Sequence, residues 1–454
     1  MTDYTPYNQY IKQYMDRSIA ELSQLCAQPS VGAQNWGLVE CAELTATLLR
    51  QRGFTVEILS TGGAPVVFGE RQGKSDKTLL FYNHYDVQPP EPLDLWISPP
   101  FEPTIRDGHL FARGVSDDKG HITSRLHAID ALLAKDGELP CNIKFIIEGE
   151  EETSSVHLED FVMNNANRLA ADACIWEFGG VDHQGTPMQF LGLRGICYVE
   201  LTVEKLSQDV HSGTGGSIFP NAAWRLVWAL NTLKGPDEKI RIPGYYDNVV
   251  PPSERDRQLM NALPETAGEY RNRYGVEQFL HGLTGGVDLR IAEVFQPTCT
   301  ICGLTSGYQG PGSKTVLPAR ASAKVDFRLV PNQTPAEVIQ KLRAHLDAQG
   351  FSDIQVTLLG GEAPGRTDPD DPFVQLVVNS AEAVYGKAMQ IVPMVGGSGP
   401  NHVFLETLHL PIVTAGIGHP GSQAHAPNEN ISLDLYQKGA EHIVRILKEF
   451  GEAA

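Results

Sequence analysis

The segment Leu79-Leu-Phe-Tyr-Asn-His-Tyr-Asp86 places a histidine and an aspartate directly after an apolar run. A short apolar run of this kind is typical of a strand that is buried on both faces of a parallel sheet. In open α/β sheets, ligands bind beyond the carboxyl ends of the strands. Imidazole and carboxylate groups also bind metal ions. His84 and Asp86 are therefore a first indication of a metal site, although a His-x-Asp pair is a weak signal alone.

Short apolar runs alternate with helix-like segments around this stretch. We expect strands at 77–83, 143–147 and 173–176, and helical spacing covers about 12–52, 122–133 and 158–169. This alternation predicts an α/β domain with a mostly parallel sheet. Further acidic groups and one histidine stand beside these elements: Asp117-Asp118, Glu150-Glu151-Glu152, Glu177 and, after a long interval, His425.

The interval before His425 is explained by an inserted domain at 193–362. Its expected elements are a strand at 197–203, a helix at 221–233, strands at 299–304 and 321–330, a helix from Pro335 to Gly350 and a strand at 354–359. This is the ferredoxin-like order. We therefore expect a first domain formed by 1–192 and 363–454, interrupted by the insertion.

The overall composition narrows the class of protein. A chain of 454 residues exceeds what one hydrophobic core usually supports, so two domains are expected. The formal charge of −19 disfavours nucleic acid or an anionic membrane surface as a partner. Seven scattered cysteines and an N-terminus without an apolar leader favour a soluble protein of a cytoplasm-like compartment.

Each acidic group also has an ordinary structural interpretation. Asp117 and Asp118 precede a helix, where one of them could cap the backbone N–H groups. The alternative is a carboxylate whose two oxygens bridge two cations. The run at 150–152 could be a solvated strand end. In an extended segment, however, neighbouring side chains point in opposite directions, so one Glu could bind metal while the next faces a water molecule.

Taken together, the motifs resemble the dinuclear metallopeptidase family that includes carnosinase, succinyl-diaminopimelate desuccinylase, aminoacylase and glutamate carboxypeptidase. The resemblance covers nearly the whole chain, and its elements are His84-Tyr-Asp86, Arg113-Gly-Val-Ser-Asp117-Asp-Lys-Gly120, Glu148-Gly-Glu-Glu151-Glu152, His211-Ser-Gly213, Arg328-Leu-Val-Pro331, Gly396-Gly-Ser398 and His425-Ala-Pro-Asn428. It implies a catalytic domain of the zinc exopeptidase type, with the insertion as a lid and dimerisation domain. It also implies a cis peptide between Asp117 and Asp118.

The resemblance implies two divalent cations, with zinc favoured and manganese or cobalt as alternatives. Asp117 would bridge the two ions. His84 and Glu177 would complete one coordination shell, and Glu152 and His425 the other. Asp86 would orient a ligand, and Glu151 would be the general base that moves a proton from water to the leaving nitrogen. His121 and His127 lack such motifs and are expected to be packing or surface residues.

The inserted domain would contribute substrate contacts. His211 resembles the family's oxyanion-stabilising histidine, which reaches the active site of the other subunit in a homodimer. Arg328 resembles the residue that binds the substrate's terminal carboxylate, a task that suits its bidentate fork. Thr315 and Ser398 stand where the family has hydroxyl contacts.

Two substrate classes stay open. The leading hypothesis is an exopeptidase that cleaves small peptides with a free carboxylate, and the alternative is an N-acyl amino acid deacylase. The Glu at 177 is typical of carboxypeptidase-like enzymes and deacylases. Val395 replaces a carboxylate of carnosinase-like members that could pair with a free amine. A third hypothesis, a catalytically silent metal-binding protein, is disfavoured by Glu151, because a purely structural site needs no base.

Overall fold

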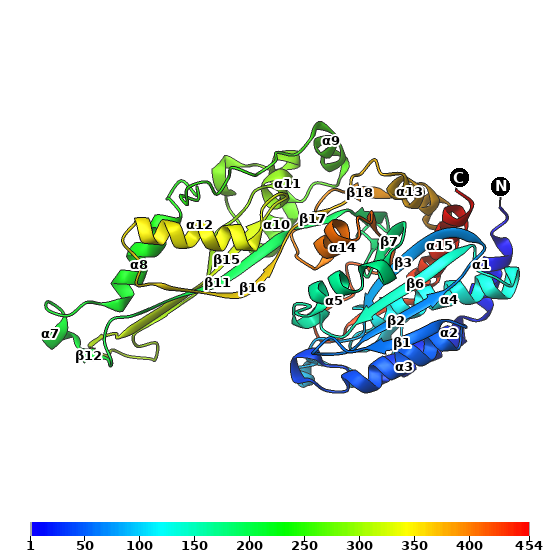
Figure 1. Cartoon of the computed structure of the whole chain (residues 1–454), viewed down its shortest axis with the longest axis horizontal. Coiled ribbons are helices and arrows are strands. Elements are labelled where there is room, and N and C mark those ends of the chain that lie inside the picture. Colours follow the sequence, from blue (N-terminus) through cyan, green and yellow to red (C-terminus); the bar gives the residue numbers. More distant parts are fainter. Residues whose placement is uncertain (1, 454) are drawn as a thin grey trace. The chain divides into compact units, whose positions relative to one another are not determined.

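The computed structural model describes residues 2–453, which form two compact units (Figure 1). Unit 1 comprises 2–192, 366–393 and 403–453, and unit 2 comprises 193–365 and 394–402. The segment Met394–His402 thus belongs to unit 2, whereas the sequence interpretation assigned it to the first domain. Main-chain bonds are the reason, because Leu193 forms a bridge with Val395 and the Arg194 N–H donates to the Gly397 carbonyl at 2.9 Å.

A six-stranded mixed sheet is the centre of unit 1. Three of its five strand pairings are parallel, namely β6 with β3, β3 with β7, and β7 with β19. The other two pairings are antiparallel. The strand order is β1 (Thr55–Leu59), β2 (Val66–Arg71), β6 (Cys141–Glu148), β3 (Ser75–His84), β7 (Ala173–Trp176) and β19 (Ile412–Thr414). The predicted α/β class is confirmed.

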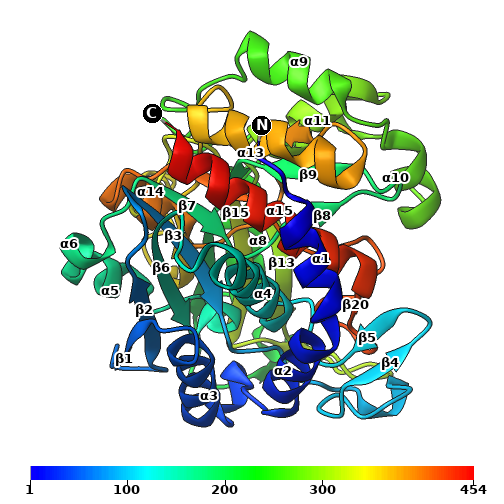
Figure 2. The same cartoon turned by 90° about the vertical axis from the view of Figure 1, so that its right-hand side faces the viewer.

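Helices cover both faces of this sheet because its central strands are apolar on both sides. Leu80 and Tyr82 of β3 pack in one core cluster with residues of α5 (Leu158–Asn164) and α14 (Asn401–Thr407). On β3, Phe81 instead stacks on Phe145 of β6 at a ring distance of 4.8 Å. Figure 2 shows α4 (Lys119–Asp136) and α15 (Leu433–Glu452) side by side over the sheet.

Three helices in the structure take the place of the helical region predicted at about 12–52, and the first of them begins before it. These are α1 (Thr5–Gln13), α2 (Met15–Ala27) and α3 (Leu38–Arg50). Between α2 and α3 the chain contains Pro29 and Gly37, and the φ angle of Gly37 is +74°. This left-handed backbone suits glycine, and Gly37 directly precedes the first residue of α3. The region of helical spacing is therefore divided into separate helices.

Unit 2 contains the expected ferredoxin-like sheet. All three pairings are antiparallel, in the order β13-β15-β11-β16. The Thr334 hydroxyl accepts the N–H of Glu337 at 3.3 Å and caps the start of α12, which begins at Pro335 as expected. The elements are β11 (Gly195–Glu204), α8 (Ala222–Leu233), β13 (Thr300–Ser306), β15 (Arg320–Leu329), α12 (Pro335–Ala348) and β16 (Gln355–Glu362).

Two features of unit 2 extend this pattern. Between α8 and β13 the chain adds three helices, α9 (Glu254–Ala262), α10 (Ala267–Tyr274) and α11 (Gly286–Phe295). A short ladder of β12 (Val210–His211) with β14 (Val316–Leu317) continues beyond one end of the long strands. Among residues 2–453, no helix has the length and apolar composition needed to cross a membrane.

Candidate active site

The predicted metal ligands of unit 1 lie beyond the carboxyl ends of its parallel strands. His84 is the last residue of β3, and Glu177 directly follows β7. Glu152 lies in the short 3-10 helix η3 (Glu151–Thr153) after β6. Asp117 lies two residues before α4, and His425 lies in the loop before β20 (Asn430–Ser432). The three central strands are hydrogen-bonded neighbours, so their ends present these groups at one edge of the sheet.

Asp117 has a different imidazole at each carboxylate oxygen. Its Oδ1 lies 2.9 Å from Nε2 of His84, and its Oδ2 lies 2.9 Å from Nε2 of His425. Nε2 of His425 is also 3.2 Å from Oε2 of Glu152. Ligand atoms of Asp117, Glu152 and His425 all lie within 4.8 Å of one another. This arrangement suits a carboxylate that would contribute one oxygen to each of two cations, with His84 beside one oxygen and His425 and Glu152 beside the other.

Asp86 is fully buried and holds two parts of the site. Its carboxylate oxygens accept the backbone N–H groups of Glu151 at 3.2 Å and Glu152 at 3.0 Å. Nδ1 of His84 lies 3.1 Å from the Asp86 carbonyl and 3.4 Å from its carboxylate. Because Nδ1 is directed at Asp86, Nε2 is the nitrogen that can face a metal ion.

Glu177 provides a test of whether the site fits a cation. The residue is only 8% exposed, and its Oε2 has no hydrogen-bond partner among the described residues. A buried carboxylate oxygen without a donor is costly, and a cation or a proton would compensate it. Carboxylates with two imidazoles are a donor set that suits zinc or manganese. The residues therefore fit divalent metal ions.

The carboxylates of the site interact strongly. Burial raises the pKa of Glu151 well above its ordinary value, and the charge of Asp117 raises it further. Burial and the charge of Glu151 likewise raise the pKa of Glu177. Such shifts cluster at functional sites, and bound cations would counteract them by favouring the ionised carboxylates.

The pKa values of the two imidazoles are also raised. Hydrogen bonding to Asp117 and Glu152 raises the pKa of His425 to about 10. Burial lowers the pKa of His84, but its hydrogen bonds to Asp117 and Asp86, together with the charges of Glu151 and Asp117, raise the pKa well above its usual range. The site thus attracts positive charge, whether protons or metal ions.

In unit 2, His211 and Thr315 are neighbours. The Gly213 N–H donates to Nδ1 of His211 at 3.1 Å, which leaves the proton of a neutral ring on Nε2. Nε2 lies 3.1 Å from the Thr315 hydroxyl. His211 can therefore donate a hydrogen bond to an oxygen, which is what an oxyanion stabiliser must do.

Arg328 and Ser398 form a second pair in unit 2. Nη1 of Arg328 donates to the Ser398 hydroxyl at 2.8 Å, and its Nε donates to Asp326 at 3.1 Å. These bonds hold the guanidinium in one orientation. The Arg328 side chain is only partly buried, so its remaining donors can meet a carboxylate.

The His211–Thr315 pair and the Arg328–Ser398 pair lie near opposite ends of strand β15. His211 and Thr315 lie at the β12–β14 ladder, which is next to the start of β15 at Arg320. Arg328 lies near the other end of β15, and Figure 1 shows the ladder and the strand. Arg328 lies eight positions after Arg320 along the strand, a span of about 26 Å at about 3.3 Å per residue. The structure therefore does not bring the predicted unit 2 residues together within one chain.

Sequence reasoning did not anticipate the hydrogen-bonded group behind the site. Asp118, joined to Asp117 by the expected cis peptide, accepts from Asn83 and lies 3.0 Å from Nδ1 of His121. Arg125 of α4 donates to the carbonyl of Tyr82 at 3.0 Å. The only signal for Asp118 was its position beside Asp117. For Arg125 there was none, because sequence does not separate a buried arginine from an exposed one.

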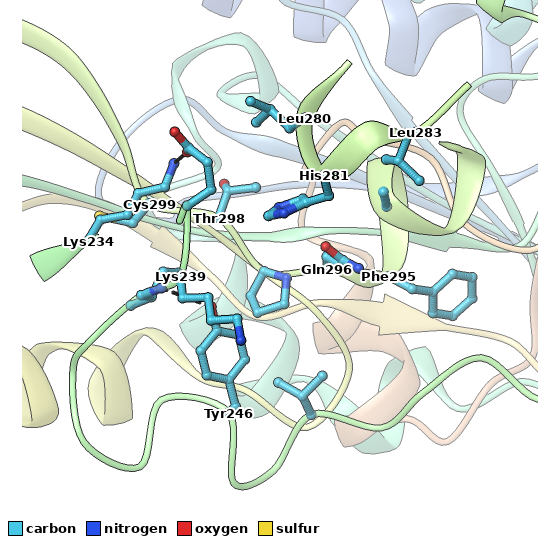
Figure 3. Close-up of a pocket in the computed structure, with 15 residues that line it drawn as sticks. Lys234, Lys239, Tyr246, Leu280, His281, Leu283, Phe295, Gln296, Thr298 and Cys299 are labelled. Carbon is cyan, nitrogen blue, oxygen red and sulfur yellow. Dashed lines mark hydrogen bonds and ion pairs between the residues drawn. The ribbon is translucent and has the colours of Figure 1, made fainter. Parts of the chain in front are cut away.

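Unit 2 also contains a cleft of about 660 Å³ in the region of the added helices (Figure 3). Its wall includes apolar side chains such as Ile240 and Phe295, and a Lys234–Glu238 ion pair lies at its edge. None of the predicted site residues lines it. One lining residue, Thr298, is nevertheless hydrogen-bonded to the main chain of Arg328.

Comparisons with known proteins give a consistent result. A model of the peptidase family M20/M25/M40 matches residues 80–449. The Beta-Ala-His dipeptidase of Mus musculus is 28% identical, covering 95% of this chain and 92% of that protein. The Cys-Gly metallodipeptidase of Schizosaccharomyces pombe is 28% identical, with 94% of each chain covered.

Solved structures agree with this result. An M20 family metallo-carboxypeptidase from Sulfolobus solfataricus superimposes with a TM-score of 0.90 at 37% identity, covering 96% of this chain and 99% of that one. Human carnosine dipeptidase 1 superimposes with a TM-score of 0.81 at 28% identity, covering 100% and 99%.

Proposed function

This chain belongs to the peptidase family M20/M25/M40 and is a metallopeptidase, and from that premise we propose that His84, Asp117, Glu152, Glu177 and His425 hold two divalent cations at its active site. The observation that carries the proposal is the pair of 2.9 Å contacts that direct one Asp117 oxygen at each imidazole. Zinc is the cation we propose, and manganese or cobalt would accept the same ligands.

The cations, when bound, would lower the pKa of water and polarise the carbonyl of the scissile amide. Glu151 is the proposed general base. It would take a proton from water and then deliver it to the leaving nitrogen. Asp86 keeps Glu151 in place through the backbone N–H that it accepts.

The proposed substrate is a small peptide with a free carboxylate. Arg328, oriented by Asp326 and Ser398, would bind that carboxylate through its fork. Relatives of this chain carry the names of dipeptidases and of a carboxypeptidase, which supports a substrate of this size.

Deacylation of N-acyl amino acids is the second candidate. One observation favours it: position 395, next to Gly396-Gly-Ser398, is a valine and offers no charge to a free amine. An acyl group needs no such partner. The terminal carboxylate would still bind to Arg328.

We also propose that the active site is completed by a second copy of the chain. The span of about 26 Å along β15 keeps the His211–Thr315 pair away from Arg328 in one chain. A small peptide cannot reach both pairs. His211 would therefore stabilise the oxyanion in the site of its partner.

An exposed apolar face on unit 2 supports a homodimer. Trp224, Val227 and Trp228 lie on one face of α8, and each is more than 40% exposed. Beside this helix the sheet ends in β13, an edge strand with exposed Ile301 and Leu304. Apolar faces and open strand edges of this kind mark association surfaces.

The seven free cysteines agree with a reducing, cytoplasm-like compartment.

A substrate panel with two variants tests the proposed reaction. Metal-loaded protein is assayed on free dipeptides and on N-acetyl and N-succinyl amino acids. Glu151→Gln should keep the metal and lose turnover by about 10²-fold to 10⁴-fold. Arg328→Lys should raise KM for every substrate with a free carboxylate.

Two outcomes would contradict these assignments. Complete indifference to blocking of the amine would exclude the dipeptidase version and leave the deacylase. Unchanged turnover of Glu151→Gln would remove Glu151 from its role as base.

A further inference from the structure

The carboxylate of Glu429 is buried and accepts hydrogen bonds from four donors. Its Oε1 accepts the backbone N–H groups of Ser116 at 2.8 Å and Asp117 at 3.0 Å. Its Oε2 accepts the N–H of Gly114 at 2.9 Å and Nη1 of Arg113 at 2.8 Å. Glu429 is 1% exposed. One side chain thus fixes most of the backbone of the segment that ends at Asp117.

Arg113 connects the same segment to the loop of His425. It is 1% exposed, and besides Glu429 it donates to the carbonyl of Ala426 at 3.4 Å and to that of Pro89 at 3.1 Å. The main chain adds a further tie, because the N–H of Ala112 donates to the carbonyl of Glu429 at 3.2 Å. The segments 112–117 and 425–429 are therefore held together as one framework.

We propose that Glu429 is a positioning residue that keeps Asp117 and His425 in register for metal binding. The inference rests on the proposed metal site and adds a residue to it. Asp117 can direct one oxygen at each imidazole only while the backbone that carries its side chain keeps its orientation. Two of the four hydrogen bonds to Glu429 fix this backbone, because they come from the N–H groups of residues 116 and 117.

The alternative is a carboxylate that contributes only to folding. In that case its replacement would lower the melting temperature and leave metal affinity unchanged. Asp130 offers a matched control, because it also pairs with a buried arginine, Arg52, at 2.7 Å. Among residues 2–453, neither Asp130 nor Arg52 forms a hydrogen bond with a proposed metal ligand. Asp130→Asn should therefore destabilise the protein without changing its metal sites.

The experiment measures metal binding rather than activity. The full-length chain is stripped of metal, and zinc is titrated against a chromophoric chelator to give the stoichiometry and the dissociation constants. Glu429→Gln should weaken at least one of the two sites by about 10-fold to 100-fold, the usual effect of removing a group that orients a ligand. Asp130→Asn should match the wild-type affinities at both sites.

Glu429→Asp serves as a second variant if Glu429→Gln does not fold. It keeps the charge opposite Arg113, but it is shorter by one methylene and cannot reach all four donors at once, so it should also weaken a site. Wild-type affinities at both sites in either folded variant would overturn the positioning role. Wild-type protein that binds fewer than two ions, or a His425→Ala variant with both affinities intact, would instead contradict the proposed metal site.

Discussion

Two inactive variants should restore activity to each other if the active site is shared between subunits. The variants are His211→Ala, which removes the proposed oxyanion donor, and Glu151→Gln, which removes the proposed base. Each homodimer would lack one required group at both sites. In a mixed dimer, the subunit that retains Glu151 would receive an intact His211 from its partner.

The expected recovery follows from symmetry. Random exchange of equal amounts gives mixed dimers as about half of the population, and each has one complete site of two, so activity should reach about a quarter of wild type. If His211 acted within its own chain, no complete site would form. The span of about 26 Å between the two ends of β15 is the reason to expect recovery.

A double variant provides the matched control. His211→Ala with Glu151→Gln in one chain, mixed with an equal amount of wild type, should leave about a quarter of wild-type activity if sites are shared and about half if they are not. Turnover is measured before and after subunit exchange, and exchange itself is followed with differently tagged chains. Demonstrated exchange without recovery in the first mixture would refute the shared site.

Two further predictions concern single residues of unit 1. Burial lowers the pKa of His442 to about 4, and its Nε2 bonds to Ser380 at 3.0 Å, so the folded state keeps it neutral while the unfolded chain binds a proton below about pH 6.5. Stability from this group is present above pH 6.5 and should fall by about 3 kcal/mol as the pH drops to 4. Urea unfolding at both pH values should show a smaller loss for His442→Gln, and an equal loss would contradict the assignment. Asp86→Asn should lower metal affinity or kcat/KM by about 10-fold to 100-fold, because an amide cannot accept both N–H groups of Glu151 and Glu152. Wild-type values in chelator competition and in turnover would show that Asp86 does not position the site.

The central sheet and the ferredoxin-like sheet were predictable because their strands are short apolar runs between turns. The run before His84 and the alternation along 197–203 both specify a buried strand, and the structure has β3 and β11 there. The long helical region was less accurate. Helical periodicity continued across Pro29 and Gly37, so the pattern did not show where the chain leaves the helix.

The site was predictable only where ligand chemistry and position coincide. Asp117, Glu152 and His425 lie close together because the loops at one sheet edge meet there. The motif that begins at Arg113 was recognised, but the role of Arg113 and the residue Glu429 were not, because the role of both depends on burial and on backbone groups that are distant in sequence. The separation of His211 from Arg328 also required the strand geometry.

Metal content measured together with activity tests the central claim most directly. The chelator-treated chain is dialysed against zinc, and bound metal is determined by elemental analysis in parallel with peptide hydrolysis. We predict that activity is lost with the metal and returns as two ions bind per chain. Full activity in protein shown to contain no divalent metal would contradict the account.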